Sequence, residues 1–241
     1  MAAGSLLIDR FGHARDVDVK SSATDMVSAA DRDAENLICA GLLEARPEDG
    51  LVGEEGSRRE SVSGRNWIVD PLDGTTNFLY GFPGWAVSIA LEGSLGIVFD
   101  PLREEVWVAE RGGGASLNGE ALHLGPPPPL ETALVATGFG YDAERRAKQA
   151  QVLGRVVPFI RDIRRAGAAA LDLCWLAAGR LDAYYERGLN PWDWAAARIV
   201  VEEAGGAVAD LQGDPHGLAA AHPELLPQLL GLLGEAEAGV F

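Results

Sequence analysis

The most informative stretch of the sequence is residues 67–78, which read Trp67-Ile68-Val69-Asp70-Pro71-Leu72-Asp73-Gly74-Thr75-Thr76-Asn77-Phe78. Its three leading apolar residues predict a buried strand, and Pro71, which has no backbone N–H, ends the ladder of that strand. Asp70 therefore lies at the strand end, and Asp73 follows in a tight turn that Gly74 permits. We expect the two carboxylates to converge at one edge of a sheet.

Residues 74–77 add a second feature directly after these carboxylates. They supply free backbone N–H groups and two hydroxyls at an expected helix N-terminus, which suits a phosphate. Mg²⁺ takes oxygen ligands, commonly carboxylates together with substrate phosphate oxygens. An Asx-type turn with a capping aspartate explains the same residues without any ligand, so the stretch alone leaves both interpretations open.

Two further acidic clusters favour the ligand-binding interpretation. Gly53-Glu54-Glu55-Gly56 ends a short predicted strand, so that Glu54 can lie beside Asp70, although a solvated acidic loop is the simpler explanation. Asp193 stands between two tryptophans in the first turn of an apolar helix. It complements the helix dipole there, yet a carboxylate with apolar neighbours is poorly solvated and favours a bound cation.

Composition excludes several classes of protein. The 241 residues carry a formal net charge of −16, which repels nucleic acid and leaves cations as the means of attracting a phosphorylated substrate. No apolar run is long enough for a bilayer span, and the first 20 residues lack the apolar centre of a secretory signal. Two cysteines, Cys39 and Cys174, are no disulfide framework. We expect a cytoplasmic protein with no membrane or nucleic-acid partner.

A run of four prolines, residues 126–129, divides the chain into two expected halves. Before it, a helix over 31–45 with a capping box from Ser28 to Asp31 precedes short apolar runs typical of an antiparallel meander. After it, we expect strands over 134–137 and 181–185 and helices over 143–157, 166–178, 191–204 and 223–234. Helices on sheets in both halves predict a layered α+β protein. Residues 1–125 would hold the metal-binding loops, and residues 126–241 would complete the site.

Together the motifs resemble those of the inositol monophosphatase family, and of its bacterial members most of all. That family has an acidic Gly-Glu-Glu, an Asp-Pro-(Ile/Leu)-Asp-Gly-Thr-Thr-Asn-Phe loop and a Trp-Asp helix start followed by Glu-Ala-Gly-Gly, which this chain has at 53–55, 70–78, 192–193 and 203–206. The resemblance implies a layered αβαβα sandwich, shared with fructose-1,6-bisphosphatase. It also implies a homodimer and a phosphomonoesterase with two or three Mg²⁺ per site.

The resemblance assigns roles to individual residues. It implies that the metal ligands are the side chains of Glu54, Asp70, Asp73 and Asp193 and the carbonyl of Leu72. The catalytic residues would be Thr75, in contact with the attacking water, Asp31 behind it, and Glu55 as a supporting carboxylate. The substrate would be bound by the amides of Gly74 and Thr75 and by Gly167, Ala169, Glu186 and Asp193.

We therefore expect metal-assisted hydrolysis of a small phosphate monoester, with inositol monophosphate first among the candidates. Ala168 stands where the family commonly has a hydroxyl residue, so one polar contact to inositol would be missing. Fructose 1,6-bisphosphate, histidinol phosphate, a nicotinamide dinucleotide phosphate and a 3′-phosphoadenosine nucleotide are the alternative substrates. A regulatory binding protein is the alternative from another class. The basic pair Arg164-Arg165 is assigned to an interface or a supporting role.

Overall fold

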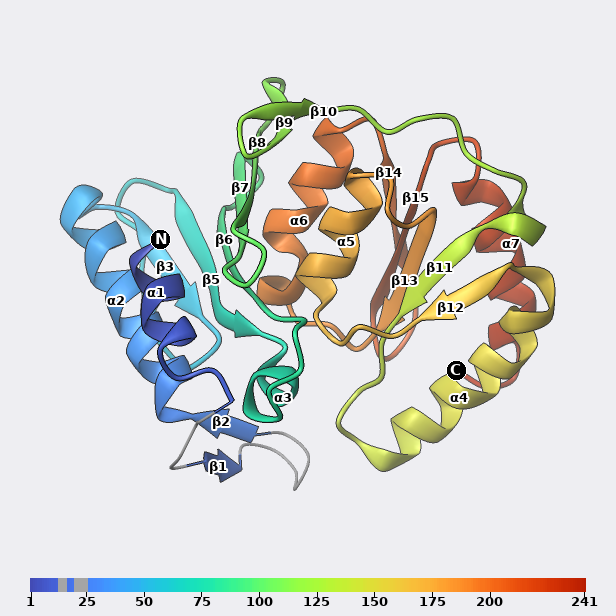
Figure 1. Cartoon of the computed structure of the whole chain (residues 1–241), viewed down its shortest axis with the longest axis horizontal. Helices are drawn as coiled ribbons and strands as arrows, with labels where there is room; N and C mark the ends of the chain where they lie inside the picture. The colour runs from blue at the N-terminus through green and yellow to red at the C-terminus, as the bar shows by residue number, and fades with distance from the viewer. Residues whose placement is uncertain (13–16, 20–25) are drawn as a thin grey trace.

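The computed structural model describes residues 1–12, 17–19 and 26–241 of the chain, and gives side chains for residues 1–12 and 28–241. In this part of the chain, helices and sheets alternate in five layers (Figure 1). Helices α1 (Ala2–Ile8) and α2 (Ala29–Ala45) cover the outer face of the first sheet. The α+β sandwich predicted from the sequence is thereby confirmed.

Within the described ranges the first sheet has eight strands, in the order β10-β9-β8-β7-β6-β5-β3-β4. The strands are β3 (Gly50–Gly53), β4 (Arg58–Arg59), β5 (Asn66–Asp73), β6 (Ala86–Leu91), β7 (Leu95–Asp100), β8 (Glu105–Glu110), β9 (Gly114–Leu117) and β10 (Glu120–Leu122). From β5 to β10 they form the expected antiparallel meander. The prediction is wrong for β3, which pairs with β5 in parallel, because the strand β4 and the loops around it intervene and let the chain return in the same direction.

The second sheet has the strand order β12-β11-β13-β15-β14 among the described residues. Its strands are β11 (Leu134–Thr137), β12 (Asp162–Arg164), β13 (Ala183–Arg187), β14 (Ala207–Leu211) and β15 (Gly217–Ala221). Strand β11 pairs in parallel with β12 and β13, whereas β15 is antiparallel to both of its neighbours. A further hairpin of β1 (Val17–Val19) and β2 (Met26–Ser28) stands apart from both sheets.

Two helices fill the space between the sheets, α5 (Ala169–Ala177) and α6 (Pro191–Glu203). They are apolar nearly all round, as a helix covered on both sides must be. On the outer face of the second sheet lie α4 (Ala143–Val156) and α7 (Leu226–Glu237). Because α6 contacts strands of both sheets, it carries residues 191–193 to a place that both halves of the chain share.

Several expected boundaries shift. Helix α5 begins at Ala169 and not at 166, because Gly167 has a φ of 90° that a helix cannot contain. The last helix begins at Leu226, three residues after the expected start. The capping box from Ser28 to Asp31 is confirmed, and Asn190 is the N-cap of α6. Both cysteines are buried and free, as expected.

Candidate active site

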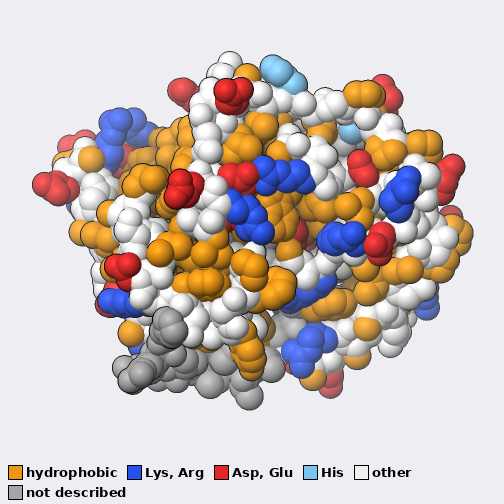
Figure 2. All heavy atoms as spheres, in the orientation of Figure 1, with side chains coloured by type: hydrophobic (Ala, Val, Ile, Leu, Met, Phe, Trp, Pro, Cys, Tyr) orange, Lys and Arg blue, Asp and Glu red, His pale blue; other side chains and the backbone are white. Residues whose placement is uncertain are grey.

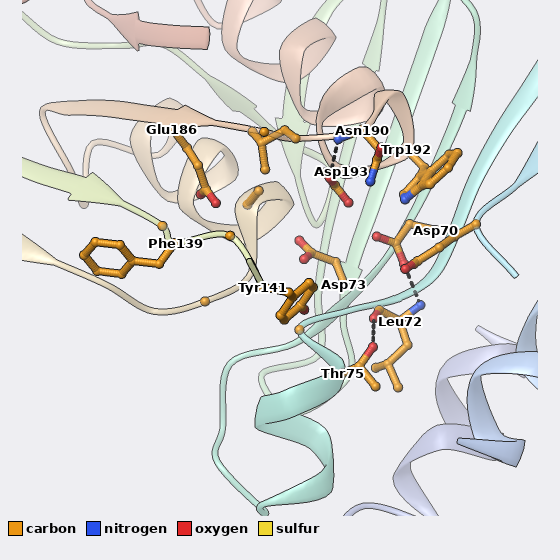
Figure 3. A pocket seen from close by; sticks show the side chains of 18 of the residues that line it. Asp70, Leu72, Asp73, Thr75, Phe139, Tyr141, Glu186, Asn190, Trp192 and Asp193 are labelled. Carbon is orange, nitrogen blue, oxygen red and sulfur yellow. Dashed lines mark hydrogen bonds between the residues drawn. The ribbon is translucent and has the colours of Figure 1, made fainter. Parts of the chain in front are cut away.

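A cavity of about 360 Å³ lies where the ends of β5 and β13 meet the start of α6 (Figure 3). Ten of the predicted site residues line it: Glu54, Asp70, Leu72, Asp73, Gly74, Thr75, Gly167, Ala169, Glu186 and Asp193. Asp31 and Glu55 do not line the cavity. Residues more than a hundred positions apart in the sequence thus share one wall.

The end of β5 determines where Asp70 and Asp73 point. The pairing of β5 with β6 is irregular between these residues, and the Leu72 N–H donates to Asp70 Oδ1 at 2.9 Å. Gly74 then turns the chain with a φ of 92°, and a Cβ at this position would lie 2.8 Å from the carbonyl oxygen of Gly84. The irregular strand end and the glycine turn bring both carboxylates to one cavity, as the sequence predicts.

Asp73 and Asp193 are each oriented by a backbone N–H at a helix start. The Ala170 N–H donates to Asp73 Oδ2 at 2.7 Å, and the Asn190 N–H donates to Asp193 Oδ2 at 2.6 Å. Asp193 therefore caps its helix and lines the cavity at the same time, so its two interpretations are compatible. In Figure 3 the carboxylates of Asp73 and Asp193 point toward each other.

Neighbouring acidic side chains raise the pKa values of Asp70 and Asp73. Burial, and then the charges of Glu54, Asp73 and Asp193, hold the pKa of Asp70 well above its usual range. Burial and Asp193 do the same to the pKa of Asp73, against the hydrogen bond from Ala170, which lowers it. A cation among these groups would relieve both desolvation and repulsion.

This donor set fits a hard divalent ion. Carboxylates are the ligands Mg²⁺ prefers, and it usually keeps waters and substrate phosphate oxygens in the remaining positions. Within the described ranges, however, no three acidic, histidine or cysteine side chains are already arranged to hold one ion. Mg²⁺ needs only one or two protein carboxylates at a time, which Asp70, Asp73 and their acidic neighbours supply.

Thr75 and Asp31 lie together at the acidic end of the cavity. The Thr75 hydroxyl lies 3.0 Å from Asp31 Oδ1 and 3.1 Å from the Leu72 carbonyl oxygen, so its one proton is shared between two acceptors. Asp31 is fully buried, and its other oxygen accepts from the Ser28 N–H at 2.9 Å. Asp31 thus caps α2 and orients the hydroxyl that lines the cavity.

Glu35, which the sequence did not single out, holds the acidic loop after β3. Its buried carboxylate accepts from the N–H groups of Glu55 at 2.7 Å and of Ser57 at 2.9 Å. A Cβ at Gly53 would lie 2.4 Å from that carboxylate. Glu35 therefore fixes the loop that carries Glu54, whereas a supporting role of the Glu55 side chain stays a prediction.

The other end of the cavity is built around Glu186 on β13. Enclosure raises the pKa of Glu186 to about 7, although the Tyr184 hydroxyl, which donates to Glu186 Oε2 at 2.6 Å, and the charge of Arg165 lower it. Beneath it, burial and the charge of Glu186 hold the pKa of Asp172 well above its usual range. Figure 3 shows Glu186 across the cavity from Asp70. The motifs did not indicate Tyr184 or Asp172, since neither adjoins an acidic cluster.

Solved structures of bacterial proteins have this fold. The chain is similar to an IMPase from Thermotoga maritima, with a TM-score of 0.90 and 30% identity over 100% of this chain and 95% of that one. It is also similar to the extragenic suppressor protein suhB from Bartonella henselae, with a TM-score of 0.89 and 38% identity over 97% and 94% of the two chains. The fold is thus that of a known class of layered α+β proteins.

Sequence comparison identifies the family within this class of fold. An inositol-1-monophosphatase from Mycobacterium bovis is 45% identical over 205 residues, 80% of this chain and 71% of that protein. A Nus factor SuhB from Pseudomonas aeruginosa is 44% identical over 217 residues, 84% and 79% of the two proteins. The model of the inositol monophosphatase family matches residues 1–237. The chain belongs to the inositol monophosphatase family, whose members support a metal-dependent phosphatase activity.

Proposed function

We propose that the chain is a Mg²⁺-dependent phosphomonoesterase that hydrolyses inositol monophosphate to inositol and phosphate. The observation that carries the proposal is the convergence of Glu54, Asp70, Asp73 and Asp193 on one cavity beside Thr75. The raised pKa values of Asp70 and Asp73 mark a site that is unfavourable without a cation. Membership of the family supports the phosphatase class, and the choice of inositol monophosphate rests on resemblance.

Each part of the chain has a role in this proposal. The four acidic side chains and the Leu72 carbonyl would hold two or three Mg²⁺. Bound there, Mg²⁺ would lower the pKa of water, orient the phosphoryl group and neutralise charge on the leaving oxygen. Thr75, whose proton is shared by Asp31 and the Leu72 carbonyl oxygen, would accept a hydrogen bond from the attacking water. The amides of Gly74 and Thr75 would bind the phosphate, and Glu186 would accept hydrogen bonds from substrate hydroxyls.

Removal of metal tests the proposal directly. We expect dialysis against a chelator to abolish phosphate release from inositol monophosphate, and added Mg²⁺ to restore it. Mg²⁺ should also raise the thermal midpoint by mass action, since it binds only the folded site; 100 times Kd corresponds to about 2.7 kcal/mol. Full activity in metal-free protein would contradict the mechanism, and an unchanged midpoint at millimolar Mg²⁺ would contradict the site.

A regulatory role is the second candidate, because relatives named Nus factor SuhB are as similar to this chain as those named inositol-1-monophosphatase. We favour the enzyme, since all four acidic residues of the motifs are present and line one cavity. The homodimer and the cytoplasmic location stay predictions. In the described residues no helix is long and apolar enough to cross a bilayer.

A further inference from the structure

The end of the cavity that faces away from the acidic cluster carries two arginines. Arg145 lies in the first turn of α4, and Arg165 precedes α5; both line the cavity that Asp70 and Asp73 line. Arg165 acts on Glu186 and Asp172, whose pKa values its charge lowers. Arg145 has no comparable carboxylate partner, so its role needs a separate explanation.

Many arginines of this acidic chain pair with a carboxylate. In the part of the chain that the structure describes, Arg145, like Arg46 and Arg58, does not, but of these three it alone lines the cavity. Arg180, Arg187 and Arg198 each form an ion pair with a glutamate, and several others pair likewise. Among the described residues, the guanidinium of Arg145 forms neither a hydrogen bond nor an ion pair. Asp142 also lines the cavity, but its Oδ1 accepts from the Arg145 backbone N–H at 2.8 Å as the cap of α4. A half-buried, unpaired guanidinium at a cavity wall is a position for an anion.

Two glycines admit the Arg145 side chain to the wall. A Cβ at Gly188 would lie 2.5 Å from Arg145 Nη1, and a Cβ at Gly140 would lie 2.7 Å from Arg145 Cδ. Gly188 also has a φ of 84°, which disfavours other residues. The absence of a side chain at Gly140 and at Gly188 thus leaves room for the Arg145 side chain against both backbone segments.

The cavity is therefore polarised. A phosphate held at the acidic end by cations would place its alcohol toward Glu186 and Arg145, since Glu186 lies across the cavity from Asp70 (Figure 3). Its volume of about 360 Å³ leaves room for more than a phosphate. An alcohol that met both groups would present hydroxyls to Glu186 and an anionic group to Arg145.

We propose that Arg145 is a specificity residue that binds a second anionic group on the alcohol of the substrate, so that, among esters of one alcohol, the ester that carries a second phosphate is preferred. The proposal rests on the proposed phosphatase function and specifies its substrate class. It does not depend on inositol as the alcohol.

Fructose 1-phosphate and fructose 1,6-bisphosphate test the proposal, because they differ only in the second phosphate. In Arg145→Gln we expect kcat/KM for the bisphosphate to fall about 10- to 150-fold, the range for a lost charge-assisted hydrogen bond, and that for the monophosphate to change less than about twofold. Arg145→Lys keeps the charge without the planar fork and should lose less.

Lys148→Gln is the matched control. Lys148 lies on the same helix, and its substitution by Gln removes the same charge. Its ammonium, however, lies 5.7 Å from the centre of the Phe241 ring and outside the cavity. Both kcat/KM values should stay within about twofold of the wild type. Equal losses on both esters in Arg145→Gln, an unchanged ratio, or the same ratio change in Lys148→Gln would overturn the proposal.

Binding without turnover separates this proposal from the proposed function. In chelator, fructose 1,6-bisphosphate should raise the thermal midpoint of the wild type more than fructose 1-phosphate does, and Arg145→Gln should lose that difference. If the wild type hydrolyses neither ester with Mg²⁺, the phosphatase proposal is wrong, and the thermal measurement still decides on Arg145. Equal shifts by both esters in the wild type would overturn the second anion position.

Discussion

The two ends of the cavity differ in how the charges of their carboxylates are compensated. At one end Asp70 and Asp73 gather with other carboxylates, and their mutual repulsion adds to the desolvation that raises their pKa values. At the other end Glu186 has a hydroxyl donor at 2.6 Å and the charge of Arg165 nearby, and its pKa rises only to about 7. The acidic end requires an external cation, whereas at the far end the chain itself supplies the groups that compensate the charge of Glu186.

On the surface of the molecule, unlike at the acidic end of the cavity, acidic side chains lie beside basic ones. In the view of Figure 2, acidic and basic side chains are interspersed between apolar ones. Surface carboxylates such as Glu202 and Asp210 have arginine partners within ion-pair distance. The acidic cluster that raises the pKa values of Asp70 and Asp73 is therefore not a consequence of the net charge of −16 alone, and it marks the site.

The largest effect is expected when one acidic ligand loses its charge. Asp193→Asn keeps an oxygen that can accept from the Asn190 N–H, so the cap of α6 is retained while several kcal/mol of charge stabilisation are lost. Turnover should fall about 1,000-fold at about 1.4 kcal/mol per factor of ten. Steady-state kinetics and chemical denaturation should be measured on the same variant.

Asp142→Asn is the control, because Asp142 also caps a helix and lines the same cavity, at its far end. We expect it to lose about 0.3–1 kcal/mol of unfolding free energy and little turnover on simple monoesters. If the two variants lose similar turnover, the acidic end is not the catalytic end.

A smaller effect is expected at the hydroxyl of Thr75. Thr75→Val keeps the shape and removes the donor that lies 3.0 Å from Asp31 Oδ1, so turnover should fall about 100-fold, the lower range for a group that assists proton transfer. Thr75→Ser keeps the hydroxyl and should recover most of the activity. Equal activity of the two variants in phosphate-release assays would leave Thr75 with a structural role only.

The smallest effect is expected at the far end. Tyr184→Phe removes the hydroxyl that lowers the pKa of Glu186, so this pKa should move upward from about 7. Because Glu186 accepts substrate hydroxyls only when ionised, kcat/KM for inositol monophosphate rises with pH through that pKa. The variant's profile should shift to higher pH by about one unit, or about 1.4 kcal/mol.

Two controls keep that result specific. Tyr185→Phe changes the next residue, which faces the other core on the opposite side of β13, and should leave the profile in place. Hydrolysis of p-nitrophenyl phosphate, which offers no hydroxyl to Glu186, should show no shift in either variant. A shift of both substrates by Tyr184→Phe would place its effect at the acidic end instead.

The acidic end could be predicted because its information is local. Asp70 and Asp73 share one strand end and one turn, and Asp193 is fixed by a helix start, so strand, turn and cap chemistry place each carboxylate. Thr75 follows in the same segment. Reasoning on each motif separately could not predict that these distant segments form one site. The resemblance to a family supplied that prediction.

By itself, the sequence determined the alternation of helices and strands, the motifs at the strand and helix ends and the carboxylates they carry. Only the tertiary structure decided that Glu35 holds the acidic loop, that Tyr184 donates to Glu186, and that Arg145 enters the cavity past Gly188. The physical reason is range: hydrogen bonds within a turn follow from neighbouring residues, whereas these contacts join elements whose distance depends on how two sheets pack around α5 and α6.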